Sequence, residues 1–139
     1  MKPTFLSPLF LSPLSWHQVG VQHYVLDASL RYYSRILGRV IEVKAGFNTD
    51  AESCPRWLPI INSLFGNIAD QPAVVHDWLY FTSEVSRKKA DQVLLEAMCV
   101  VGIPAWRRQG VYWGLRIGGW AAWNAHRQLG HPPYSPGQP

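Results

Sequence analysis

Short stretches in the first half of the chain alternate between apolar and polar side chains. In residues 39–47, Ile41 and Val43 flank Glu42, so that successive side chains would point to opposite faces of a strand. Residues 18–33 are rich in Val, Tyr and Leu and lack helical spacing. Such segments are typical of half-buried strands. The pattern predicts two strands that form a hairpin or belong to a small antiparallel sheet.

The second half of the chain changes to helical periodicity. A first helix is predicted over residues 71–81. A second helix follows the N-cap candidate Ser86, carries apolar residues at intervals of three and four, and ends at Gly102. A third helix is predicted over residues 104–126, whereas residues 48–71 are rich in Pro, Asn, Asp and Ser and predict a loop. The predicted fold class is therefore α+β, with a small antiparallel sheet and three main helices.

The two ends of the chain differ in composition from its centre. Residues 5–14 contain the sequence Phe-Leu-Ser-Pro-Leu twice, and the repeated proline excludes a helix, so residues 1–15 are predicted to be an extended arm. Residues 16–128 are predicted to form a single α+β domain, and residues 129–139 a proline-rich tail. The apolar side chains of the arm need burial on this domain or on a partner, and burial on this domain is favoured.

Composition argues against several classes of protein. Apolar residues make up 47% of the chain and charged residues 16%, which excludes a disordered chain. The net charge is +4, but the basic residues are scattered, which argues against specific nucleic-acid binding. Cys54 and Cys99 lack the spacing of a disulfide framework or a metal finger. Pro8 and Pro13 interrupt the N-terminal apolar stretch, which argues against a signal peptide, and no apolar run predicts a transmembrane helix.

A segment of the first predicted helix combines histidine, aspartate and tyrosine. His76 and Tyr80 lie four positions apart and share a face, whereas Asp77 is turned about 100° away. Asp91 lies near the start of the next helix and can reach His76 if the two helices pack antiparallel. Histidine is the usual base at neutral pH, and it needs a carboxylate that fixes its tautomer. The pattern predicts that His76 is a base oriented by Asp91, that Tyr80 donates to Asp91, and that Asp77 holds a cation.

The same four residues also fit a purely structural role. An aspartate in the first turns of a helix is stabilised by the helix dipole without any catalysis, and Tyr80 can serve only to pack. In this alternative, the side chains form an interior polar network that determines how the two helices pack.

Residues 46–57 are a second candidate site. Asp50 and Ser53 belong to a group of closely spaced oxygen donors, a composition that suits calcium. The alternative, which is favoured, is a turn held by hydrogen bonds from side chains to the backbone. Cys54 has no base near it in the sequence, and Cys99 is predicted to be a small core residue.

The third predicted helix carries Trp106, Trp113 and Trp120 at intervals of seven residues. Indole rings with this spacing fit a membrane interface or a partner helix. The alternative, which is favoured, is that they fill the core around the first two helices.

The centre of the chain contains four short motifs in a specific order: Phe47-x-Thr-Asp50, Ser53-x-Pro-Arg56, Val75-His-Asp-x-Leu-Tyr80 and Arg87-x-x-Ala-Asp91. Together they resemble a phage and prophage family of unknown function, whose members are short proteins often encoded in tailed-phage genomes. The resemblance covers about residues 24–125. Ala51 and Glu52 depart from the small pair usual in that family.

The helix with His76, Asp77 and Tyr80, followed by Asp91 on the next helix, also resembles the core of secretory phospholipases of the A-two type. This resemblance implies that His76 activates water, that Asp91 and Tyr80 position it, and that Asp77 helps to bind calcium. It covers only about 25 residues. The cysteines of those enzymes are missing here, and their glycine-rich calcium loop is not present in its usual form.

These comparisons lead to two expectations of function. The first is a phage-encoded hydrolase of phospholipase type, with Ser53 and Arg87 as further supporting residues, calcium at Asp77 and Asp50, and phospholipid or a membrane surface as its partner. The second is a virion or tail component, or a factor that binds a host protein. In both, the expected location is the host cytoplasm or the phage virion.

Overall fold

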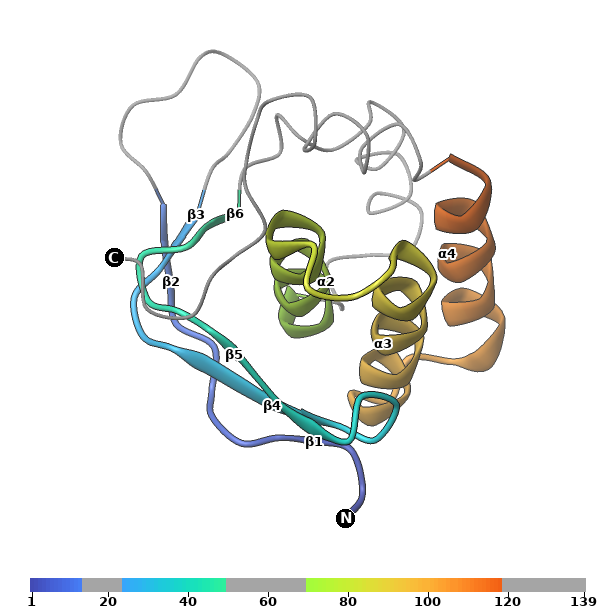
Figure 1. The fold of residues 1–139 in the computed structure, drawn as a ribbon, viewed down its shortest axis with the longest axis horizontal. Helices are drawn as coiled ribbons and strands as arrows, with labels where there is room; N and C mark the ends of the chain where they lie inside the picture. Colours follow the sequence, from blue (N-terminus) through green and yellow to red (C-terminus); the bar gives the residue numbers. More distant parts are fainter. Residues whose placement is uncertain (14–23, 50–69, 119–139) are drawn as a thin grey trace.

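The structure, a computed structural model, describes residues 1–13, 24–49 and 70–118. Within these ranges it has an α+β arrangement of small antiparallel sheets beside helices (Figure 1), so the predicted fold class is confirmed. The strands are β1 (Thr4–Phe5), β2 (Leu11–Pro13), β3 (Tyr24–Leu26), β4 (Leu30–Ser34), β5 (Arg39–Val43) and β6 (Asn48–Thr49). The helices are α2 (Asp70–Thr82), α3 (Arg87–Val100) and α4 (Ala105–Gly118).

The strands form two three-stranded sheets, in the orders β1-β4-β5 and β2-β3-β6, with antiparallel neighbours. The hairpin of β4 and β5 pairs Tyr32 with Ile41 and Ser34 with Arg39. Its turn contains Gly38 at φ 64°, a conformation that a residue without a side chain adopts at little cost. Alternate residues of both strands are buried, as the sequence pattern predicts.

The segment predicted as one strand over residues 18–33 is divided in its described part. Residues 27–29 separate β3 from β4, and the two strands belong to different sheets. The prediction of a single strand is therefore wrong, because local composition cannot show where a chain leaves one sheet for another. The described part of the N-terminal arm contributes β1 to the first sheet and β2 to the second.

Helix α3 begins and ends with the signals that the sequence carries. The Ser86 hydroxyl accepts a hydrogen bond from the backbone N–H of Lys89 at 3.3 Å, which caps the first turn. At the other end, Gly102 has φ 83° and donates to the carbonyl of Cys99, while Ile103 donates to that of Met98. These two bonds satisfy carbonyls of the last turn and turn the chain toward α4.

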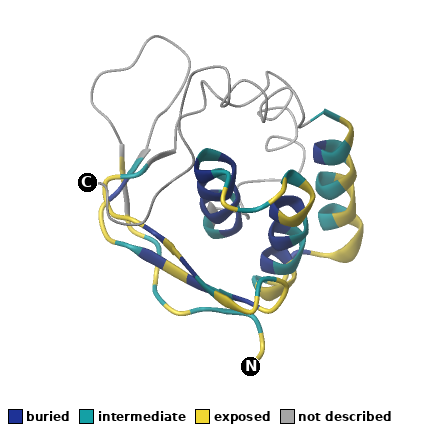
Figure 2. Ribbon diagram, in the orientation of Figure 1, coloured by how far each residue is buried: buried dark blue, intermediate teal, exposed yellow. Residues whose placement is uncertain are grey.

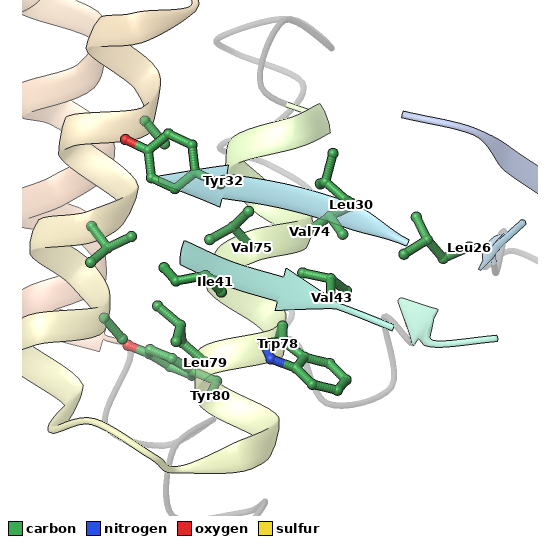
Figure 3. Close-up of a cluster of buried hydrophobic side chains, with 13 residues drawn as sticks. Leu26, Leu30, Tyr32, Ile41, Val43, Val74, Val75, Trp78, Leu79 and Tyr80 are labelled. Atoms are coloured by element: carbon green, nitrogen blue, oxygen red, sulfur yellow. The ribbon is translucent and has the colours of Figure 1, made fainter. Parts of the chain in front are cut away.

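The main core lies between the β4–β5 hairpin and the helices α2 and α3. Tyr32, Ile41 and Val43 on the strands are buried together with Val75 and Leu79 on α2 (Figure 3). Burying side chains of this kind stabilises the fold by about 1.5–3 kcal/mol each. Because one face of α2 packs against the sheet, another face of α2 is left to contact α3.

A smaller apolar cluster joins α3 to α4 through Leu94, Met98, Ile103 and Leu115. In contrast, Trp106 and Trp113 remain 67% and 59% exposed, so the prediction that these indoles fill the core is wrong. Figure 2 shows the exposed outer side of α4. Only one face of α4 packs into the core, and this is the face that carries Leu115.

One further sequence prediction is wrong, and others lie partly outside the described residues. Cys99 is exposed, which contradicts its prediction as a core residue, because it lies on the outer side of α3. The third helix is described as far as Gly118. The remainder of that predicted helix, with Trp120, and the proline-rich tail over 129–139 lie outside the described residues. Among the described helices, none has the length and apolar content that a membrane span requires.

Candidate functional site

His76 and Tyr80 lie one turn apart on the same face of α2, as their spacing predicts. Their rings pack against each other with centroids 4.1 Å apart and an angle of 43° between the planes. Both side chains are buried, and the Tyr80 hydroxyl points toward α3 (Figure 3). The helix therefore presents an imidazole and a phenol together to its neighbour.

Asp91 on α3 meets both groups. One carboxylate oxygen, Oδ1, lies 2.9 Å from His76 Nε2 and accepts a hydrogen bond from the Tyr80 hydroxyl at 2.6 Å. Asp91 has no exposed surface. The antiparallel packing of α2 and α3 thus brings the three predicted residues into one cluster, which we call the His76–Asp91 cluster.

The second oxygen of Asp91 faces two arginines. Arg116 on α4 donates from Nη1 to Oδ2 at 3.0 Å, and Nη1 of Arg87, one turn before Asp91, lies 3.8 Å from the same oxygen. Arg87 also donates to the backbone carbonyls of Leu115 and Arg116, at 3.1 and 3.4 Å. The cluster therefore connects all three described helices.

The charge of Asp91 is stabilised by these partners. Burial alone would raise the pKa of the Asp91 carboxyl, but its contacts with His76, Tyr80 and Arg116 lower the pKa below the ordinary value. Burial, and then the hydrogen bond to Asp91, raises the pKa of the Tyr80 phenol well above its usual range. Tyr80 is therefore a permanent donor, and Asp91 is ionised at neutral pH.

This arrangement determines the tautomer of His76. An ionised carboxylate only accepts hydrogen bonds, so Nε2 carries the proton and donates to Asp91. In the neutral ring, Nδ1 then holds the lone pair and is the atom that can take up a proton. A buried carboxylate orients the histidine of catalytic triads in the same way.

Asp77 lies on the Nδ1 side of the imidazole. Its Oδ1 is 4.0 Å from His76 Nδ1, too far for a direct hydrogen bond. The Asp77 side chain keeps 33% of its surface exposed, whereas the His76 side chain keeps 7%. Burial of the remaining surface raises the pKa of Asp77 to about 6, and the charge of His76 acts in the opposite direction.

The structure thus brings together His76, Tyr80, Asp91 and Arg87, with Asp77 beside them. Asp50 and Ser53, the other predicted site residues, lie outside the described residues. Within the described ranges, no three His, Cys, Asp or Glu side chains are grouped so that they could hold a metal ion. Asp77 is the carboxylate that lies on the Nδ1 side, 4.0 Å from that nitrogen.

Sequence reasoning missed Arg116. A buried carboxylate requires a cation or several donors, so the alternative in which Asp91 belongs to an interior polar network also implies a basic partner. Three arginines on α4, at positions 107, 108 and 116, satisfy that requirement equally well in the sequence. Only the packing of α4 on α3 selects Arg116.

The fold and the cluster define a class: a small α+β domain in which a histidine, a tyrosine and an arginine converge on one buried aspartate. Residues 24–115 match a family model described as "Protein of unknown function (DUF1353)". The chain belongs to this family, and the predicted membership of a family of unknown function is confirmed. Comparisons with curated proteins and with solved structures found no significant match.

Proposed function

We propose that the chain is a hydrolase in which His76 acts as the general base. The observation that supports this most directly is the division of labour between the two ring nitrogens. Nε2 is held by Asp91 at 2.9 Å, and Nδ1 faces the partly exposed Asp77 at 4.0 Å. A base needs one nitrogen that is oriented and one that can receive a proton.

In the proposed reaction, Nδ1 of His76 takes a proton from a water molecule as its oxygen attacks an ester carbonyl carbon. Asp91 stabilises the imidazolium that forms, and Tyr80 and Arg116 keep Asp91 in place. The intermediate then collapses by cleavage of the bond between the carbonyl carbon and the alkoxy oxygen. His76 returns its proton to the departing alkoxide, which completes hydrolysis to an acid and an alcohol.

The proposed substrate class is a glycerophospholipid ester. The support is the placement of His76, Asp77 and Tyr80 on one helix and Asp91 on the next, the arrangement on which the resemblance to secretory phospholipases rests. The order of the family motifs supports a phage or prophage origin, with activity in the host cytoplasm or in the virion.

The proposed reaction does not require calcium, and the effect of calcium on the rate is left to the assay. Calcium takes six to eight oxygen ligands, and within the described ranges no three His, Cys, Asp or Glu side chains are grouped to hold a metal ion. The described residues alone therefore do not form a calcium site, and the reaction above contains no step through a metal ion. Whether calcium accelerates the reaction is decided by assay with calcium and with a chelator.

The test is release of fatty acid from phosphatidylcholine and phosphatidylglycerol by the purified full chain. His76→Ala should lose at least about 100-fold in rate, the usual contribution of a general base. His76→Gln should lose as much while keeping an N–H that can donate to Asp91. Glu42→Gln, an exposed change on β5, is the control that should keep full activity. Equal rates in His76→Gln and the wild type would contradict the proposal.

The rival proposal is a non-enzymatic phage protein, which docks on a virion or host protein and uses the His76–Asp91 cluster only to join its helices. The observation that favours it is the burial of the cluster, since Asp91 is fully covered and His76 almost so. Under this proposal His76→Gln, Asp91→Asn and Tyr80→Phe should lower the melting temperature, and no ester should be hydrolysed by the wild type.

A further inference from the structure

The outer face of α4 is apolar although it faces solvent. Trp106, Gly110, Trp113 and Ile117 fall within an arc of about 60° on a helical projection. The side chain of Ile117 is 77% exposed, and both indoles are more than half exposed. Leu115 lies about 180° from Trp106 and is buried against α3. The helix therefore has two apolar sides, one in the core and one outside.

One arginine lies against this face, and α4 has no acidic residue. Helix α4 contains Arg107, Arg108 and Arg116 and neither Asp nor Glu. The Arg107 guanidinium lies over the Trp106 ring, 5.0 Å from its centroid, at one end of the face.

The last turn of α4 adjoins a basic segment of α3. Arg87 contacts the carbonyls of Leu115 and Arg116, so the start of α3 adjoins the last turn of α4. Lys88 and Lys89, which follow Arg87, are both exposed. Arg87 and Arg116 are themselves paired with the buried carboxylate of Asp91 and so add little net charge at the surface.

We infer that the face formed by Trp106, Gly110, Trp113 and Ile117 docks on an anionic lipid surface, with the indoles at the level of the headgroups. Indole rings prefer the boundary between headgroups and acyl chains, and flanking cations attract acidic lipids. The proposed hydrolase activity is not needed for this inference, because the face is defined by exposure and charge alone.

A second copy of the chain fits this face less well. In a twofold dimer the same patch meets itself, so the Arg107 side chains beside the two faces would be brought together without an acidic partner from α4. An anionic surface instead places opposite charges against them. Charge complementarity therefore favours lipid as the occupant.

The test is co-sedimentation of the full chain with vesicles of ether-linked lipids, which contain no ester to hydrolyse. One set is pure phosphatidylcholine, and the other contains equal amounts of phosphatidylcholine and phosphatidylglycerol. The chain should bind the second set more strongly, and salt should weaken the binding. Trp113→Gln and Ile117→Gln should each reduce the partition coefficient about tenfold, as expected for the loss of one large buried apolar side chain.

Phe10→Gln is the matched control. Phe10 is 53% exposed and adjoins β2, on the opposite side of the molecule from α4 (Figure 1). This variant should bind the acidic vesicles like the wild type. Equal losses in Phe10→Gln and Trp113→Gln, or equal binding to both sets of vesicles, would overturn the inference. A dimer in solution that Trp113→Gln dissociates, without any binding to acidic vesicles, would assign the face to a second copy instead.

Discussion

At the scale of single residues, the buried carboxylate of Asp91 orients its neighbours. One oxygen accepts from Tyr80 and is bonded to His76 Nε2, and the other is bonded to Arg116. Removing one partner of a buried ion pair commonly costs about 3–5 kcal/mol, because the remaining charge is left uncompensated. The charge of Asp91 is thus tied both to the stability of the fold and to the orientation of His76.

Asp77 should affect stability in the opposite pH direction from Asp91. Its pKa in the folded chain is about 6, above the ordinary value of 3.8, so the folded state binds more protons than the unfolded state between these values. The contribution of this carboxyl to stability therefore falls as pH rises through that window. Asp77→Asn should gain stability relative to the wild type from pH 3.8 to about 6 and keep a constant difference above it.

Urea unfolding at a series of pH values measures this difference. For Asp91, whose pKa is lowered, the stabilising contribution is complete above the ordinary value and is lost as pH falls below it. The deficit of Asp91→Asn should therefore shrink in acid. A difference between Asp77→Asn and the wild type that is independent of pH would show that Asp77 has an ordinary pKa.

At the scale of elements, two arginines join α4 to α3 beside the His76–Asp91 cluster. Arg116 reaches from α4 to Asp91, and Arg87 reaches from α3 to the carbonyls at the end of α4. The position of α4 is therefore coupled to the charge of Asp91.

Arg116→Gln should lower the free energy of unfolding by about 1–3 kcal/mol, less than the loss of a sole partner, because Asp91 keeps its bonds to His76 and Tyr80. If His76 is the general base, the variant should also change the pH dependence of the rate, an effect that a role only in packing would not produce. Arg31→Gln, an exposed change on β4, is the control and should leave stability unchanged. Thermal and urea unfolding measure the first effect; equal stability of both variants would exclude the proposed role of Arg116.

At the scale of the whole molecule, a carboxylate on α3 connects the helices to the β4–β5 hairpin. Glu96 accepts from the Tyr32 and Ser34 hydroxyls with Oε1, and from the backbone N–H groups of Arg35 and Ile36 with Oε2. Four donors on one carboxylate hold the hairpin turn against α3. This contact is remote in sequence from the His76–Asp91 cluster but lies on the same helix.

Glu96→Gln replaces one acceptor oxygen by an NH2 donor, so only one of the two pairs of donors keeps its acceptor. The expected cost is about 1–3 kcal/mol in the free energy of unfolding, with faster amide exchange at the hairpin turn. Glu42→Gln, exposed on β5, is the matched control. Exchange that is unchanged in Glu96→Gln would show that the turn does not depend on this carboxylate.

The types of the elements and part of the site follow from local sequence. The spacing of His76 and Tyr80 places them on one helix face, and Ser86 and Gly102 mark the ends of α3. These features were predictable because they depend on backbone geometry over a few residues. The division of residues 18–33 between two sheets was not, because strand pairing depends on distant segments.

The sequence by itself determined that an imidazole, a phenol and two carboxylates would lie on two successive helices. Tertiary structure alone decided that Arg116 completes the shell of Asp91 and that the indoles of Trp106 and Trp113 face outward. The physical reason is that α4 carries apolar side chains on two opposite sides. Periodicity identifies both sides, and only packing against α3 selects which one is buried.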